Sequence, residues 1–68
     1  MRHLELVVLA PDELEAFRLI DYKGLDQEGA SKRMKVSRIT VQRIYKNARK
    51  KVAKALVEGL AIELINKN

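Results

Sequence analysis

Two short apolar segments stand near the ends of the chain. Residues 4–9 (LELVVL) are rich in branched apolar side chains and are bounded by Ala10 and Pro11, a pattern typical of a strand. Residues 60–65 (LAIELI) repeat this pattern after Gly59, where continued helix is the competing interpretation. Because an isolated two-stranded ribbon is marginal in water, we expect the two strands to pair with each other or across a dimer.

Apolar residues recur at helical spacing between these segments. The first predicted helix covers about residues 11–22, with Pro11 at its first position and Gly24 after its end. The second covers about residues 27–34 and follows Asp26, whose carboxylate can accept hydrogen bonds from the free N–H groups of the first turn. Both helices are short, so their packing partners must supply most of their stability.

The third predicted helix is the longest element. It begins after Ser37, a second capping residue, and meets no glycine or proline until Gly59. Placing its residues at about 100° per step separates an apolar side from a polar and basic side. The apolar stripe, about 120° wide, contains Val41, Ile44, Tyr45, Ala48, Val52, Ala55 and Leu56. The opposite side carries Ile39, Thr40, Gln42, Arg43, Lys46, Asn47, Lys50 and Lys54.

The charged residues are unevenly distributed along the chain. Residues 1–31 hold three basic side chains against seven acids, whereas residues 32–54 hold ten basic side chains and no acid. Ten charges of one sign in so short a segment repel each other unless a polyanion is near. The distribution therefore favours a nucleic-acid partner over a surface that is merely solvated.

The small size of the chain favours oligomerisation. With 68 residues and no cysteine, it forms one domain at most and has neither a disulfide nor a thiolate metal site. A domain this small buries about 60% of the surface that its unfolded chain exposes. We therefore expect a homodimer, in which a second copy covers apolar surface.

Residues 27–44 have the pattern of a helix-turn-helix. This motif requires small residues where its two helices touch, and Ala30 and Ser31 supply them. Lys35 stands at the turn, where glycine is usual because φ is often positive, and a lysine there costs about 1 kcal/mol. The expected core positions are Met34, Val36, Val41 and Ile44.

The combination of motifs resembles a family of small prokaryotic proteins assigned as DNA-binding. The helix-turn-helix of that family is similar to region four of bacterial sigma factors. The resemblance covers nearly the whole chain and implies that the residues following Ser37 meet DNA. The matching pieces are PDELEA (11–16), GLDQE (24–28), VSR (36–38), ARKKVA (48–53) and ALVEG (55–59).

Side chains in the first two turns of a recognition helix reach base edges, and those around and beyond them reach phosphates. Ile39 is apolar on a polar side, which contact with a thymine methyl would explain, although single exposed apolar residues are also common. The candidates for base-edge contact are Arg38, Ile39, Gln42 and Arg43. The candidates for contact with the DNA backbone are Lys32, Arg33, Lys35, Ser37, Thr40, Lys46, Arg49 and Lys50.

Other classes of function find little support in the residues. The acids Asp12, Glu13 and Glu15 suit the positive end of a helix dipole and need no catalytic role, and His3 has no spaced ligand partners. We therefore expect no enzyme, cofactor or metal site. No apolar run reaches the roughly 18 residues of a membrane span, so we expect a cytoplasmic protein.

The sequence thus predicts one mainly α domain over residues 1–68, a three-helix helix-turn-helix domain similar to sigma region four with short terminal β-strands. Its helix-turn-helix lies at about 26–54. We expect it to bind duplex DNA in a sequence-specific way, as a homodimer and as a transcriptional regulator. The alternative is a sigma-like protein-interaction module that contacts RNA polymerase or another regulator.

Overall fold

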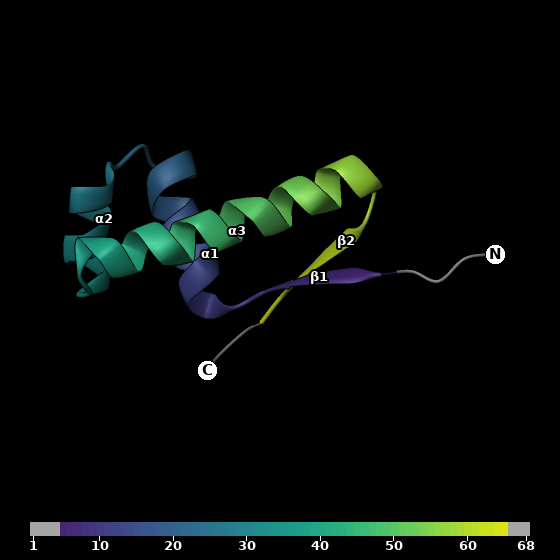
Figure 1. The fold of residues 1–68 in the computed structure, drawn as a ribbon, viewed down its shortest axis with the longest axis horizontal. Coiled ribbons are helices and arrows are strands. Elements are labelled where there is room, and N and C mark those ends of the chain that lie inside the picture. Colours follow the sequence, from purple (N-terminus) through teal and green to yellow (C-terminus); the bar gives the residue numbers. More distant parts are fainter. Residues whose placement is uncertain (1–4, 66–68) are drawn as a thin grey trace.

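The computed structural model describes residues 5–65. Along the chain it contains β1 (Leu6–Leu9), α1 (Pro11–Phe17), the π-helical segment η1 (Arg18–Tyr22), α2 (Gln27–Met34), α3 (Arg38–Glu58) and β2 (Ala61–Leu64). Figure 1 shows α3 as the long axis of the molecule, with α2 across one end and the strands near the other. The mainly helical fold with two short terminal strands is confirmed.

The two strands pair with each other within the chain. They run parallel, and Leu6 stands opposite Ala61 while Leu9 stands opposite Leu64. Parallel strands need a long crossover connection, which the three helices provide. β2 replaces continued helix because Gly59 adopts a left-handed conformation with φ of 68° and terminates α3. The strand interpretation of residues 60–65 is therefore confirmed for Ala61–Leu64.

The corner between β1 and α1 is fastened to α3. Glu13 Oε1 accepts a hydrogen bond of 2.9 Å from the N–H of Ala10 at the start of α1. Lys51 Nζ donates to the same carboxylate oxygen at 2.8 Å and to the carbonyl of Val8 at 2.9 Å. Burial would raise the pKa of Glu13, but the hydrogen bonds from Lys51 and from the Ala10 N–H, together with the charge of Lys51, lower it. Glu13 is a structural acid rather than a reactive one.

The first helix ends as a π-helix. Its extent from residue 11 to residue 22 agrees with the prediction, but the Lys23 N–H bonds the Arg18 carbonyl five residues back at 2.8 Å. A π turn widens the helix and changes the direction of the side chains within it. Gly24 then ends the helix with φ of 86°.

The core lies where the three helices meet. Leu19 of η1, Ala30 of α2 and Val41 of α3 are fully buried together. Ala30 has the small side chain that lets α2 approach α3 closely, as the motif predicts. Ser31 is also buried, and its hydroxyl donates to the Glu28 carbonyl at 2.8 Å.

The turn between α2 and α3 consists of residues 35–37. Lys35 has φ of 61° and ψ of 43°, the left-handed conformation that the sequence predicts. Two predicted core positions are wrong. Val36 is 38% exposed because it lies in the turn, outside either helix. Leu56 is 77% exposed because it stands at the margin of the stripe, one 100° step from the buried Ala55.

Candidate nucleic-acid interface

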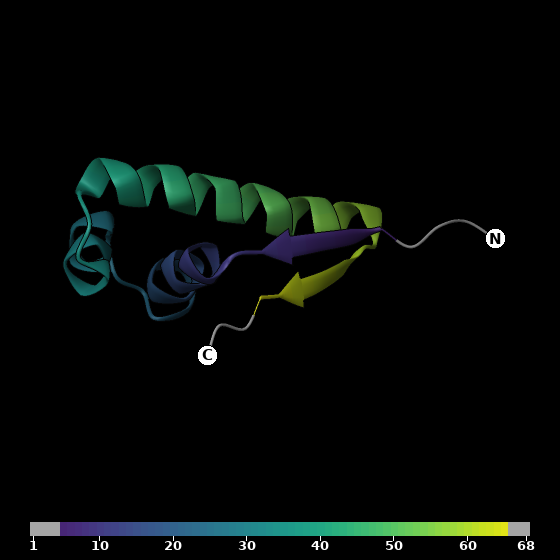
Figure 2. The same ribbon diagram turned by 90° about the horizontal axis from the view of Figure 1, so that it is seen from below.

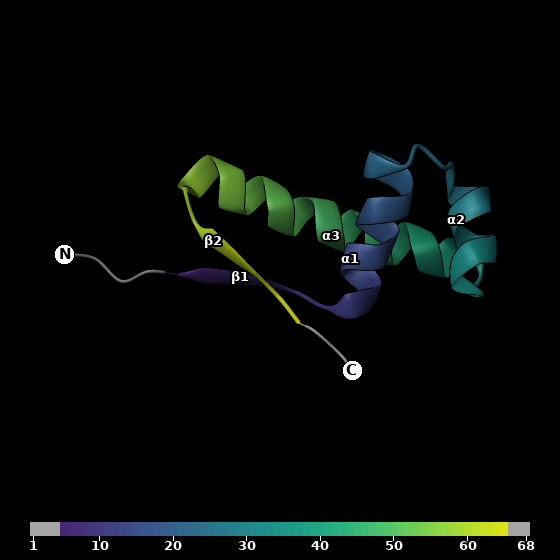
Figure 3. The same cartoon turned by 180° about the vertical axis from the view of Figure 1, so that it is seen from behind.

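α3 has one covered side and one bare side. Seen as in Figure 2, α1, α2 and both strands all lie on the same side of α3, and nothing covers the opposite side along its length. Figure 3 shows α1 crossing α3 on the covered side, with α2 beyond it. Val41, Ala48 and Ala55 are the buried residues of α3 that fix this orientation.

Ser37 sets where the helix begins. Its Oγ accepts from the Thr40 N–H at 3.1 Å and donates to Thr40 Oγ1 at 2.9 Å. The hydroxyl of Ser37 is thus used in capping, whereas Thr40 retains its own hydroxyl hydrogen for another acceptor. Both residues were predicted to contact the DNA backbone, and the structure gives Ser37 a capping role at the start of that surface.

The four residues predicted to contact base edges are exposed, and Gln42 among them also lines a groove that α3 shares with α2. Arg38, Ile39, Gln42 and Arg43 are all exposed within the first two turns of α3. Ile39 is 70% exposed and packs against no core residue. Because the residues that hold α3 against the rest of the fold lie on its other side, these four side chains can enter a groove of a ligand without disturbing the core.

Most basic side chains of residues 32–54 have no acidic partner within residues 5–65. The two that do are Arg49, whose Nε is 3.2 Å from Asp21 Oδ2, and Lys51, whose Nζ is 2.8 Å from Glu13 Oε1. The remaining eight are all exposed: Lys32, Arg33, Lys35, Arg38, Arg43, Lys46, Lys50 and Lys54. This uncompensated charge extends from α2 through the turn along α3.

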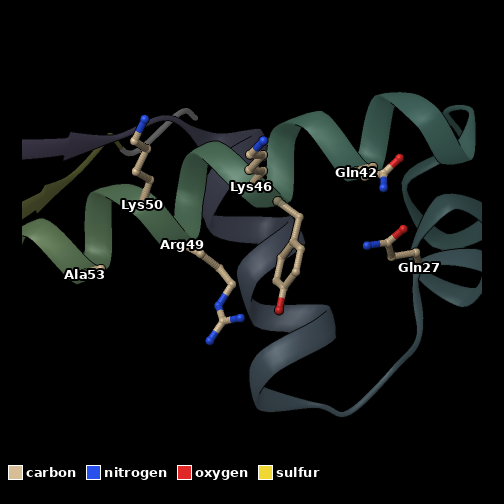
Figure 4. Close-up of a pocket in the computed structure, with 7 residues that line it drawn as sticks. Gln27, Gln42, Lys46, Arg49, Lys50 and Ala53 are labelled. Atoms are coloured by element: carbon tan, nitrogen blue, oxygen red, sulfur yellow. The ribbon is translucent and has the colours of Figure 1, made fainter.

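A groove separates the start of α2 from the middle of α3. It measures about 540 Å³ and is lined by Gln27 from α2 and by Gln42, Lys46 and Arg49 from α3, among others. Figure 4 shows Gln27 and Gln42 directed toward each other across the gap, with Arg49 projecting from α3 toward the end of the first helix. The groove therefore joins the bare side of α3 to the first turn of α2.

A cluster of three side chains borders this groove. Tyr45 OH donates to Asp21 Oδ1 at 2.8 Å, and the Arg49 guanidinium lies 5.6 Å from the centre of the Tyr45 ring. Burial raises the pKa of Tyr45, and the hydrogen bond to Asp21 and its negative charge add to the rise, against the opposing charge of Arg49. Tyr45 was predicted on the apolar stripe of the third helix, and Asp21 was not predicted as part of any site. The spacing of Tyr45 and Arg49 by four residues was the available signal.

Metal-ligating residues and membrane-spanning helices were searched for among residues 5–65. Across residues 5–65, no three acids or histidines are placed to hold a metal ion. The same residues include no helix with the length and apolar character needed to cross a membrane. His3 lies outside the described residues.

The fold and this surface define a small, mainly helical protein in which three helices and a parallel strand pair present one long basic helix. The chain belongs to the family described as protein of unknown function DUF134, whose sequence profile matches residues 2–67. The predicted membership in a family of small prokaryotic proteins is confirmed, whereas the DNA-binding role expected of that family stays a prediction.

Several curated relatives are known simply as UPF0251 proteins. The one from Moorella thermoacetica is 58% identical over 64 residues, which is 94% of this chain and 43% of the relative. The one from Pyrococcus furiosus is 57% identical over 53 residues, which is 78% of this chain and 49% of the relative. The chain spans about half the length of these relatives. No solved structure matches it significantly.

Proposed function

We propose that the protein binds duplex DNA through the bare side of α3 and acts as a transcriptional regulator. The observation that carries this proposal is the exposed side of α3, which begins at Ser37 and has no acidic residue until Glu58. A helix with one side free along its length suits the major groove, which is about 12 Å wide and admits an α-helix. The steep crossing of α2 against α3 in Figures 1 and 2 has the form of a helix-turn-helix.

The surface divides into two functional parts. Arg38, Gln42 and Arg43 have donors that match guanine and adenine edges, and Ile39 fits a thymine methyl. Lys32, Arg33 and Lys35 flank them from α2 and the turn, while Lys46 and Lys50 continue along α3, where the helix passes the phosphates. Contacts of the first kind select a sequence, and contacts of the second kind supply most of the affinity.

Selection from random DNA duplexes at two salt concentrations tests the proposal. We expect an enriched sequence motif, and the logarithm of the binding constant should fall by about 0.9 per phosphate neutralised for each unit of log salt concentration. A protein that enriches no motif and binds duplexes no better than an unrelated basic peptide would contradict the proposal. A salt-insensitive complex with RNA polymerase would instead favour the protein-interaction alternative.

We also propose that the DNA-bound form is a homodimer joined through the terminal strands. Leu6 and Val8 of β1 and Ile62 and Leu64 of β2 are all exposed, which is an unusual concentration of large apolar side chains for a single small domain. A second copy would cover this surface and the free strand edges. Two-fold symmetry would then place the half-sites about 34 Å apart, or a multiple of that distance.

Light scattering of the full chain tests the dimer. We expect twice the mass of one chain for the wild type and a shift toward one chain for Leu64→Glu. The matched control is Ala53→Glu, which adds the same charge on the exposed side of α3 and should leave the mass unchanged. A wild type with the mass of one chain at micromolar concentration would refute the dimer without affecting the proposal for α3.

A further inference from the structure

The Asp21 carboxylate holds two side chains of α3 at once. One oxygen accepts from Tyr45 OH at 2.8 Å, and the other lies 3.2 Å from Arg49 Nε. The Asp21 side chain is 28% exposed, whereas that of Arg49 is 61% exposed. The acid is thus set back in the fold, and the arginine that it holds stands at the surface.

The ion pair uses one edge of the Arg49 guanidinium. An arginine has five N–H donors in a fixed fork, and Arg49 approaches the Asp21 carboxylate with Nε at 3.2 Å. Arg49 also lines the groove, and Figure 4 shows its side chain between α3 and the end of the first helix. Planar guanidinium donors of this kind match phosphate oxygens.

The groove has further groups that suit an anion. Lys46 lines it from the same helix, and Gln27 lines it from the first turn of α2. Gln42 adds a neutral amide to the wall, and no acid lines the groove. Asp21 is not among the lining residues, although Arg49, with which it pairs at 3.2 Å, is one of them.

The π-helical segment η1 explains how Asp21 reaches this place. Asp21 lies within Arg18–Tyr22, where the wider turn alters the direction of side chains relative to α1. Leu19 of the same segment remains fully buried in the core. The segment thus keeps one residue in the core while it directs Asp21 toward α3, and π turns are frequent at functional sites.

We infer that Asp21 is a positioning residue, which holds Arg49 so that its guanidinium binds one backbone phosphate of duplex DNA at the groove between α2 and α3. This inference rests on the proposed function of α3 and identifies one contact within it. The opposing view is that Asp21 merely competes with phosphate for Arg49. The two views predict opposite effects when the negative charge of Asp21 is removed.

Affinity for the selected duplex decides between them. If Asp21 positions Arg49, Asp21→Asn binds about fivefold more weakly, which corresponds to one lost hydrogen-bonded contact, and the salt slope falls by about 0.9. If Asp21 competes with phosphate, Asp21→Asn binds more tightly than the wild type. The matched control is Glu28→Gln, which removes one exposed negative charge near the start of α2 and should tighten binding slightly.

A double-mutant cycle separates positioning from a general effect on folding. Arg49→Ala should weaken binding to the same extent as Asp21→Asn, and the double variant should be no weaker than Arg49→Ala alone. Asp21→Glu, which keeps the charge, should restore part of the affinity. Thermal melting followed by circular dichroism gives the folded fraction of each variant, and the affinities are compared per folded molecule.

Each outcome decides one question. A wild-type protein that binds duplex DNA, together with an Asp21→Asn variant of equal or tighter binding, overturns the positioning role and leaves the proposed function intact. The positioning role is also overturned if Asp21→Asn weakens DNA binding as much in the Arg49→Ala background as in the wild type. A wild type that shows no salt-dependent duplex binding overturns the proposed function, and the inference about Asp21 fails with it.

Discussion

Lys51 and Arg49 stand two residues apart on α3, and each pairs with an acid from the first helix, yet the two pairs have different surroundings. Lys51 Nζ binds both the Glu13 carboxylate and the Val8 carbonyl, and the Glu13 side chain is 12% exposed. Arg49 Nε lies 3.2 Å from Asp21 Oδ2, and the Arg49 side chain remains 61% exposed. The first pair belongs to the covered side of α3 and the second to the border of its bare side.

This difference shows that the two sides of one helix hold their charge pairs in different surroundings. Glu13 is largely buried, so the removal of Lys51 leaves a carboxylate that water reaches poorly and that has lost its cation. A charge pair in water contributes little to stability, so its members are free to serve a ligand. Substitutions on the two sides of α3 should therefore separate stability from DNA affinity.

The largest effect on stability is expected for Lys51→Met. The substitution keeps the length of the side chain but leaves the Glu13 carboxylate without its cation and the Val8 carbonyl without its donor. We expect a loss of about 2 kcal/mol, which lowers Tm by about 10 °C in a domain of this size. Thermal melting of the variant and the wild type measures the change in Tm. DNA affinity per folded molecule should not change, and a parallel loss of affinity would contradict the assignment of Lys51 to the scaffold.

Arg43→Ala should show the converse behaviour. Arg43 is exposed on the bare side and pairs with no acid within residues 5–65, so we expect Tm to stay near that of the wild type. Binding to the selected duplex should weaken by about 1–3 kcal/mol, and the preference at one base position should relax. Lys50→Ala is the control, since it should weaken binding to all sequences alike. A change in sequence preference for Lys50→Ala would refute its assignment to the backbone.

The pH dependence of stability should distinguish Glu13 from the exposed acids. Because the pKa of Glu13 is lowered in the folded state, its contribution is present above its ordinary value of 4.5 and is lost as pH falls through the folded pKa. Glu13→Gln should cost about 1 kcal/mol near neutral pH. Urea unfolding of both proteins should give free energies that converge in acid. A difference that persists below the folded pKa would show that the charge of Glu13 is not the cause.

The scaffold was more predictable from sequence than the border of the bare side. Asp26, Ser37 and Gly59 act on the backbone within a few residues, so the bounds of α2 and α3 follow from local capping chemistry. The left-handed Lys35 follows from the motif in the same way. The parallel pairing of the strands cannot be predicted from local chemistry, because it depends on where α3 returns the chain.

The Asp21 cluster lay beyond sequence reasoning for two physical reasons. Asp21 and Tyr45 are 24 residues apart, so no local spacing links them. Periodicity also assumes a regular α-helix, whereas Asp21 lies in a π turn that changes the direction of its side chain. Leu56 was placed wrongly for a simpler reason, since it stands at the margin of the apolar stripe and is 77% exposed.

Of the two charge pairs, the one with Asp21 should matter less for stability, so Arg49→Ala should have a small effect. Its pair with Asp21 is exposed on the arginine side, and exposed pairs contribute about 0.5 kcal/mol or less. Tm should therefore shift by a few degrees at most, although the same variant loses a phosphate contact in the proposed complex. Melting curves of Arg49→Ala and Lys51→Met, recorded side by side, measure the contrast. A loss of stability for Arg49→Ala equal to that for Lys51→Met would mean that Arg49 belongs to the scaffold, and the bare side of α3 would then begin beyond it.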